Sequence, residues 1–129
     1  MMNRLTGAQT KYLHVIYKAQ DNDGGIRSID IARELGVSKA SVSRMVKLLA
    51  DRGLISGAKQ GGIRLTRKGK HESAMIHDKV TRIYPFFADY LELERPEALN
   101  STYPFLCGFS EACIEQLVGK GWAPGGTPA

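Results

Sequence analysis

Apolar and polar residues alternate with helical spacing in the stretch VSKASVSRMVKLLADRGLI, residues 37–55. Four apolar side chains lie at i, i+3, i+4 and i+7, which is the pattern of one buried helical face: Val42, Met45, Val46 and Leu49. The opposite face is small, polar or basic, and it carries Ala40, Ser43, Arg44 and Lys47. The pattern therefore predicts an amphipathic helix whose polar face is either a DNA-reading surface or the solvated side of a core helix.

Two shorter helices are predicted before this stretch. The first runs from about residue 8 to residue 20, buries Leu13, Ile16 and Tyr17, and is broken by the turn sequence DNDGG. Ser28 is a good N-cap for the second, IDIAREL, where Asp30 suits the positive end of the helix dipole. Gly36 ends it and Ser38 caps the next, so two helices joined by a short turn predict a helix-turn-helix.

A β-hairpin is predicted directly after the helix-turn-helix. Gly53 ends the helix, LIS and IRLT have the alternation of strands, and the basic, glycine-rich sequence GAKQGG lies between them. A hairpin at this place is typical of the wing of a winged helix.

A long helix is predicted from about Arg67. Its apolar stripe lies far from the first core, so we expect a pairing surface made of Ile76, Val80, Ile83, Tyr84 and Phe87. Pro85 should kink this helix, because proline removes the bond to the carbonyl four residues back. The sequence ERPEALNSTYP reads as a linker, FSEACIEQLV as a short helix capped by Ser110, and residues 123–129 as a disordered tail.

Charge divides the chain into two halves. Residues 1–70 carry 14 Lys and Arg against 5 Asp and Glu, whereas residues 71–129 carry 4 against 8. A basic first half is expected to meet a polyanion. The predicted fold class is mainly α with a small β-hairpin, with a winged helix-turn-helix at 1–70 and a helical dimerisation region at 71–122.

Targeting and redox signals are few. No apolar run approaches the roughly 20 residues of a membrane helix, and no signal core follows the start, so cytoplasm is the default compartment. Cys107 and Cys113 are six positions apart and are expected to be free thiols.

The chemistry of the predicted reading helix suits the major groove of B-form DNA. Small and polar residues in its first two turns let the backbone approach, and Arg44 can reach the O6 and N7 edge of a guanine. Serine side chains and the helix N-terminus suit phosphate or base contacts, and further basic residues would neutralise phosphates. The predicted DNA-binding residues are Arg27, Ser38, Lys39, Ser41, Ser43, Arg44, Lys47, Lys59 and Arg64.

These motifs resemble the DtxR/MntR family of metal-dependent transcriptional repressors. The resemblance rests on YLHVIY, on SIDIARELGVSKASVSRMVKLLADRGLI, on GIRLTRKGK and on the final FSEACIEQL. It implies a homodimer on a palindromic DNA operator, with a dimerisation helix and a divalent-metal sensor in the second half. The absence of an SH3-like domain resembles the shorter, manganese-type branch.

The metal ligands that the resemblance implies are mostly replaced. The family's ligand positions fall at Lys11, His14, Val80, Tyr103, Leu106 and Cys107. Two of these could hold a metal, and two ligands do not make a specific site. A rearranged site of His14, His77 and Cys107 is one hypothesis; the other is that all three are structural or surface residues and that the metal response is degenerate or changed.

Other functions compete with that of a DtxR/MntR-like regulator. A small-molecule-responsive regulator of the MarR kind is one, although such chains usually have more helix before the reading head. A winged-helix module that binds only proteins is another. An enzyme is disfavoured, because His14, His71 and His77 have no paired nucleophile or acid at a recognisable spacing.

Overall fold

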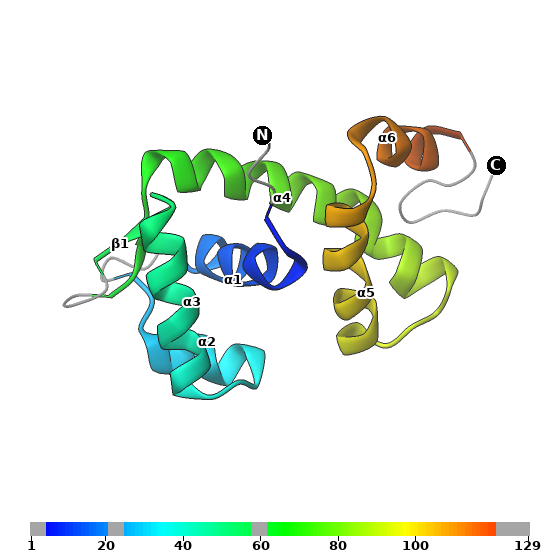
Figure 1. Ribbon diagram of the computed structural model, residues 1–129. Coiled ribbons are helices and arrows are strands. Elements are labelled where there is room, and N and C mark those ends of the chain that lie inside the picture. The colour runs from blue at the N-terminus through cyan, green and yellow to red at the C-terminus, as the bar shows by residue number, and fades with distance from the viewer. Residues whose placement is uncertain (1–4, 21–24, 58–61, 121–129) are drawn as a thin grey trace. The chain divides into compact units, whose positions relative to one another are not determined.

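The computed structural model describes residues 5–20, 25–57 and 62–120, and this part is mainly helical with one small β-hairpin. The fold class predicted from the sequence is confirmed. In chain order the elements are α1 Gly7–Lys18, α2 Ser28–Leu35, α3 Lys39–Asp51, β1 Ile55–Ser56, β2 Arg64–Leu65, α4 Arg67–Pro85, the π-helical turn η1 Phe86–Tyr90, α5 Arg95–Gly108 and α6 Glu111–Lys120 (Figure 1).

The chain divides into two compact units between residues 75 and 76. The reading unit is Gln9–Met75, and the helical unit is Ile76–Ala129 together with Met1–Ala8. The division lies inside α4, five residues beyond the boundary expected from the sequence. The predicted tail at 123–129 lies outside the described residues. None of the helices in the described ranges is long and apolar enough to cross a membrane.

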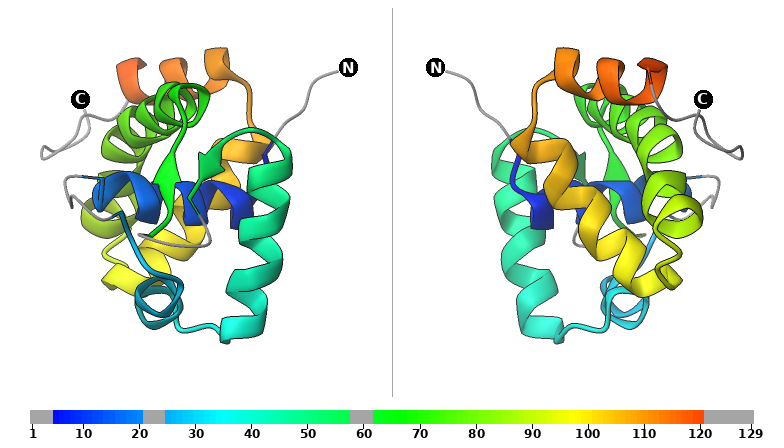
Figure 2. Two further views of the ribbon diagram at one scale, coloured as in Figure 1. Left: turned by 90° about the vertical axis from the view of Figure 1, so that its left-hand side faces the viewer. Right: turned by 90° about the vertical axis from the view of Figure 1, so that its right-hand side faces the viewer.

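The helix-turn-helix of the reading unit is formed by α2 and α3, which pack against each other (Figure 2). Gly36 makes the turn between them with φ 67° and ψ 37°, a left-handed conformation that costs glycine little. Its N–H donates to the carbonyl of Ala32, and the N–H of Val37 donates to the same oxygen at 3.1 Å. Arg27, and not the predicted Ser28, occupies the N-cap position of α2, and it makes no side-chain cap bond.

The wing is a short antiparallel hairpin that pairs Ile55 with Leu65 and Ser56 with Arg64. A third segment joins it, because Ile26 and Ile63 exchange backbone hydrogen bonds of 3.0 and 2.7 Å. The turn of the wing, residues 58–61, lies outside the described part of the chain.

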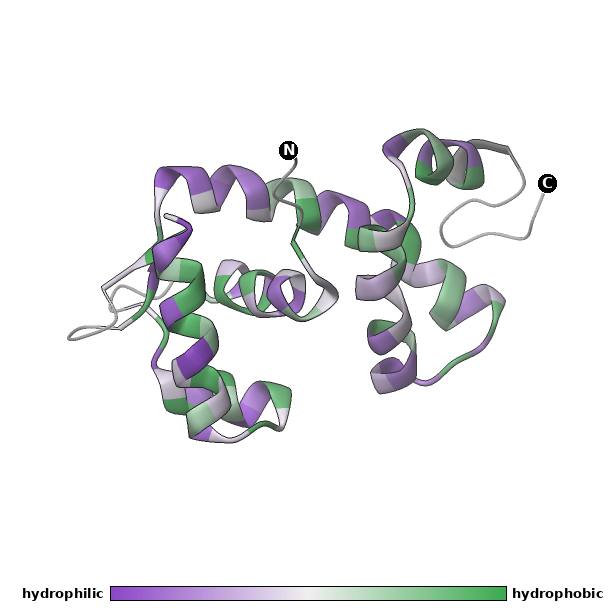
Figure 3. Cartoon of the chain, in the orientation of Figure 1, coloured by the Kyte–Doolittle hydropathy of each residue, from purple (hydrophilic) through white to green (hydrophobic). Residues whose placement is uncertain are grey.

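The core of the reading unit is mostly aliphatic. Leu13 and Ile31 are fully buried. Helices α2 and α3 bury one face each and expose their charged faces, whereas α1 is covered on nearly all sides, with residues 12–16 all buried. Figure 3 shows this division on α3, where hydrophobic and hydrophilic residues alternate around the helix. The periodicity of the sequence therefore predicts this unit well, although Met45 is half-buried instead of buried.

Pro85 marks a change of helix type. The α-helical hydrogen-bond pattern of α4 ends at Pro85, and the chain continues as the π-helical turn η1. Proline lacks the N–H needed to continue the α-helical ladder, and π-type turns are one way in which a helix absorbs such a defect. The kink predicted at Pro85 stays a prediction, whereas the structure shows a change of helix type directly after the proline.

Residues 94–104 form most of helix α5, so the prediction of a linker there is wrong. Pro96 lies in the first turn, where a missing N–H costs nothing, and burial of Ala98, Thr102 and Tyr103 compensates for Pro104 in the interior. The last helix is confirmed: the hydroxyl of Ser110 accepts from the N–H of Cys113 at 3.1 Å at the start of α6.

The apolar stripe of α4 belongs largely to the core. Ile76, Val80 and Ile83 are 8%, 6% and 0% exposed within a single chain, so a second copy cannot reach them in this structure. The prediction that these three side chains form a pairing surface is therefore corrected. Tyr84 and Phe87 are half-buried and keep part of their surface accessible.

Candidate nucleic-acid interface

Helix α3 presents a small and basic face to solvent. Val42 and Leu49 are fully buried and fix the rotation of the helix. The residues that this rotation leaves exposed are Lys39, Ala40, Ser43, Arg44 and Lys47. The first two turns therefore offer short side chains flanked by cations, which is the shape a helix needs to approach base edges in the major groove.

The N-terminus of α3 is capped as the sequence predicts. The hydroxyl of Ser38 accepts from the N–H of Ser41 at 3.1 Å, and the two hydroxyl oxygens lie 3.0 Å apart. The guanidinium of Arg44 reaches the hydroxyl of Ser41 at 3.5 Å, the outer limit of a hydrogen bond. Burial raises the pKa of Tyr12, and the positive charge of Arg44 opposes that rise. These weak contacts leave Arg44 able to turn towards a ligand.

A second pair of cations, the N-cap residue Arg27 and Arg33 of the last turn, lies along α2. The carboxylate of Asp30 lies 3.2 Å from Nε of Arg27 and 3.4 Å from a guanidinium nitrogen of Arg33. The hydrogen bond from Arg27 holds the pKa of Asp30 below its ordinary value. Both arginine side chains are 72% exposed, so water screens the pairs and a phosphate could compete for either cation.

On the wing, alternation separates the core from the surface. Ile55 and Leu65 face inwards at 3% and 8% exposure, whereas their neighbours Ser56 and Arg64 are exposed as a cross-strand pair. Arg64 thus lies on the outer face of the wing, as the DNA-binding prediction requires. Lys59, the other predicted wing residue, lies outside the described residues.

The metal-ligand candidates are spread over both units. His14 is buried in α1 of the reading unit at 3% exposure. In the helical unit, His77 is exposed on α4 and Cys107 is half-buried on α5. Among the described residues, no group of three or more His, Cys, Asp or Glu side chains is placed to hold a metal ion.

The positions that the family resemblance assigns to metal ligands have become core. Val80, Tyr103 and Leu106 are 6%, 3% and 9% exposed, and none of them carries a carboxylate, an imidazole or a thiolate. A divalent cation needs several such donors to replace its water, and manganese in particular prefers oxygen ligands. The residues present do not fit the metal.

Two groups of residues escaped the sequence analysis. Arg52, at the C-terminal end of α3, and Thr66, just before α4, make hydrogen bonds to other parts of the chain, and the only sequence signal was the position of Arg52 next to the turn glycine Gly53. In the helical unit, five rings form what we call the aromatic strip: Phe86, Phe87, Tyr90, Phe105 and Phe109. The sequences PFFADY and PFLCGF signal it only once η1 and α5 are known to contact each other.

Residues 4–63 match the family described as "Iron dependent repressor, N-terminal DNA binding domain". This segment is similar to the DNA-binding domain of iron dependent repressors. Its match covers α1, the helix-turn-helix and the start of the wing. The resemblance to the DtxR/MntR family of transcriptional regulators that the motifs predict is confirmed.

Individual relatives agree with this assignment. The HTH-type transcriptional regulator MJ0568 of Methanocaldococcus jannaschii is 29% identical over 107 residues, which cover 82% of this chain and 86% of that protein. The structure of the manganese regulator SloR is similar with a TM-score of 0.69 and 28% identity, over 91% of this chain and 53% of SloR. The chain thus spans about half the length of SloR. The IdeR structure from T. acidophilum, 21% identical with a TM-score of 0.69 over 98% of this chain and 60% of its own, shares the fold.

Proposed function

We propose that this DtxR/MntR-type regulator is a homodimeric, sequence-specific repressor that binds a palindromic DNA operator. The observation that carries the proposal is the exposed face of α3, which combines a capped N-terminus, small side chains and the cations Lys39, Arg44 and Lys47. A helix of this kind fits the major groove, where base edges can be distinguished. Bound at an operator, such a protein represses by excluding other proteins from the same DNA.

In this proposal, different residues make the base contacts and the phosphate contacts. Arg44 reads a guanine edge, and Ser38, Ser41 and Ser43 approach bases or phosphates near the helix N-terminus. Arg27, Lys47 and Arg64 neutralise phosphates, because their side chains are exposed at the N-cap of α2, on α3 and on the wing.

Pairing of two copies is assigned to the aromatic strip in place of the buried stripe of α4. Neighbouring ring centroids along the strip lie 4.3 to 5.8 Å apart, from Phe109 through Phe105, Phe87 and Phe86 to Tyr90. Its two ends, Phe109 and Tyr90, are 45% and 48% exposed. Exposed aromatic surface of this kind is enriched at interfaces, and an uncharged patch can face its own copy without repulsion.

Regulation by a divalent metal does not fit the residues present, so the proposed repressor has a degenerate or changed metal response. Operator affinity measured in EDTA, and then with Mn²⁺, Fe²⁺ or Zn²⁺ added, should not change. A stoichiometric metal that tightens operator binding would overturn this part of the proposal.

The test of DNA binding is the double variant Arg44→Ala/Lys47→Ala. Operator duplexes are first selected from a random-sequence library with the wild-type protein, and affinity is then measured by fluorescence anisotropy across a series of salt concentrations. Loss of one phosphate contact per protomer should lower the salt slope by about 2 for a dimer, and loss of the Arg44 base contact should lower affinity about tenfold or more.

The matched control is Arg95→Ala, which removes an exposed arginine from the helical unit and should leave binding and slope unchanged. A wild-type protein that selects no sequence and binds no duplex at low salt would instead support a winged-helix module that binds only proteins.

A further inference from the structure

The C-terminal end of the reading helix α3 is tied to two other parts of the reading unit, the start of α4 and helix α1. The last carbonyls of the helix itself accept from the N–H groups of residues 52–54, because helix ends need such partners. The carbonyls of residues 52–54, just beyond the helix, in turn all accept hydrogen bonds from the segment 66–68, and the side chain of Arg52 reaches back to α1.

Thr66 makes the tightest of these connections. Its hydroxyl donates to the carbonyl of Gly53 at 2.6 Å and accepts from the N–H of Gly69 at 3.0 Å. A hydroxyl has one donor and two acceptor sites, so it can perform both tasks at once. The backbone N–H of Thr66 also donates to the carbonyl of Leu54 at 3.1 Å. One residue thus caps the start of α4 and fixes the end of α3.

Arg52 and Gly69 add two further constraints. The guanidinium of Arg52 donates at 2.9 Å to the amide oxygen of Gln9, which is only 8% exposed, so the bond anchors α3 to α1. The ammonium of Lys68 donates to the carbonyl of Arg52 at 3.3 Å. Gly69 lies so close to Leu54 that a Cβ atom there would overlap its carbonyl oxygen. The first turn of α4 therefore touches the backbone that follows α3 directly.

We propose that Thr66, Arg52, Gln9 and Gly69 are positioning residues that set the direction in which α3 enters the major groove. The inference rests on the proposed DNA-binding function. None of the four lies on the exposed face of α3 that carries Arg44, so they act on DNA only through the placement of that helix.

The geometry makes this placement consequential. Arg44 lies eight residues before Arg52, or about 12 Å along a helix that rises about 1.5 Å per residue. A tilt of about 10° about the C-terminal end would move Arg44 by roughly 2 Å over that length. Productive contacts tolerate errors of only about 0.5 Å, so such a tilt is enough to break a base contact while leaving longer-range attraction to phosphates intact.

The test compares Thr66→Val with Thr66→Ser. Affinity is measured for an operator duplex selected from a random library by the wild-type protein, and for a duplex of the same composition in scrambled order. Thr66→Val should lose about tenfold in operator affinity while its affinity for scrambled DNA and its salt slope stay unchanged. Thr66→Ser keeps the hydroxyl and should restore wild-type discrimination.

Gly69→Ala supplies an independent test, with Gly108→Ala as its control. Both glycines lie in helices, but a Cβ at Gly108 meets nothing within 4 Å. Gly69→Ala should lose discrimination as Thr66→Val does, and Gly108→Ala should not. If Thr66→Val or Gly69→Ala does not fold, Arg52→Met, which keeps the aliphatic stem but removes the bond to Gln9, takes its place.

The outcomes separate the inference from the function on which it rests. Wild-type discrimination in the folded Thr66→Val and Arg52→Met proteins overturns the positioning role alone. Equal losses for operator and scrambled duplexes overturn it too, because they indicate general destabilisation. A wild-type protein that binds no DNA overturns the proposed function, and the inference with it.

Discussion

The two units of this chain differ in the residues of their cores and in the character of their surfaces. The reading unit has an aliphatic core, a left-handed glycine turn and a surface rich in Lys and Arg. The helical unit mixes aliphatic core residues with half-buried rings, contains three prolines within its described helices and is acidic. A surface that binds a polyanion needs charge and small side chains, whereas the helical unit keeps part of its aromatic surface exposed, at Tyr90 and Phe109.

Disruption of the aromatic strip should give the largest effect. Phe109→Glu places a charge at an exposed end of the strip, so we expect sedimentation to show a monomeric variant, whereas the wild type should sediment as the proposed dimer. Loss of the second half-site should reduce affinity for a palindromic operator by about 10² to 10⁴.

The control for this prediction is Met75→Glu, because Met75 is as exposed as Phe109 but lies in the reading unit. It should remain dimeric. If the Phe109→Glu protein sediments as the wild type does, the aromatic strip is not the pairing surface. The exposed rings of the helical unit would then not serve dimerisation.

The next effect is on stability and separates core from surface on α4. Ile83 is fully buried and Met75 is 45% exposed, although both are apolar residues of the same helix. Ile83→Ala should lower the free energy of unfolding by about 2–5 kcal/mol, and Met75→Ala by less than about 0.5 kcal/mol. Urea unfolding of the two variants measures the difference. If both variants lose similarly little unfolding free energy, Ile83 lies at the surface, where periodicity alone had placed it.

The sequence predicts the reading unit better than the helical unit, and the reasons are physical. Apolar residues such as Val42 and Leu49 recur with helical spacing, and local caps such as Ser38 mark the ends, so short-range information is sufficient. In the helical unit, Pro96 and Pro104 suggest a linker because their cost is local, whereas the local sequence does not signal the compensating burial of Tyr103.

Prediction of the DNA interface from the sequence is limited in the same way, to what short-range patterns reveal. The exposed face of α3 follows from periodicity, so its residues could be named in advance. The hydrogen bonds of Arg52 to Gln9 and of Thr66 to Gly53 join residues 43 and 13 positions apart, and no local sequence pattern predicts them. The apolar stripe of α4 is real, but periodicity does not say whether its own chain or a partner covers it.

A smaller effect concerns the acid within the basic surface of the reading unit. Asp30 pairs with Arg27, a proposed phosphate contact, so DNA must compete with this carboxylate. Asp30→Asn should raise DNA affinity roughly two- to fivefold at low salt, and the gain should shrink as salt rises, because exposed pairs of this kind are weak and screened. Asp89→Asn in the helical unit is the control. An affinity that falls instead would mean that Asp30 orients Arg27 for DNA.

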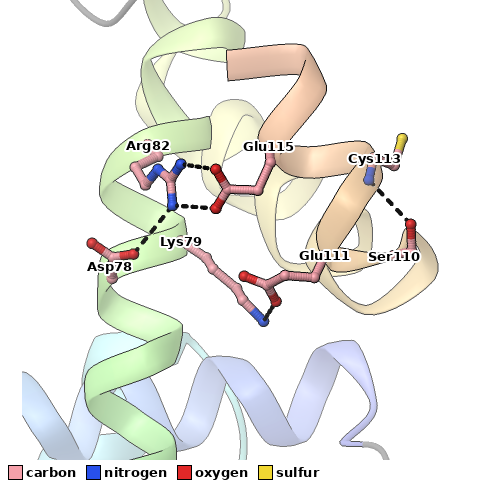
Figure 4. A network of polar contacts seen from close by, with 7 residues as sticks. All are labelled: Asp78, Lys79, Arg82, Ser110, Glu111, Cys113 and Glu115. Atoms are coloured by element: carbon pink, nitrogen blue, oxygen red, sulfur yellow. Dashed lines mark hydrogen bonds and ion pairs between the residues drawn. The ribbon is translucent and has the colours of Figure 1, made fainter. Parts of the chain in front are cut away.

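The smallest effect lies in the helical unit, where acid–base pairs join α4 to α6 (Figure 4). The two terminal guanidinium nitrogens of Arg82 donate to the carboxylate of Glu115, at 2.8 and 2.9 Å, and Lys79 pairs with Glu111 at 2.8 Å. The hydrogen bonds from Arg82 lower the pKa of Glu115 from its ordinary value of 4.5, and the same contact raises the pKa of Arg82. Because Glu115 binds its proton less readily when α6 is docked, its contribution is complete above pH 4.5 and is lost as the pH falls through the lowered value.

Amide hydrogen exchange in α6 should therefore accelerate below about pH 4, after correction for the intrinsic pH dependence of exchange, more than exchange in α3 does. Glu115→Gln should remove most of this additional acid sensitivity, whereas Glu97→Gln should leave it unchanged, because Glu97 is an exposed acid of α5. The effect is small because Glu115 is exposed and Arg82 is only half-buried, so water screens the pair, and added salt should weaken it further. An α6 that exchanges independently of pH would show that Ile114, its buried apolar anchor, holds the helix without help from the ion pairs.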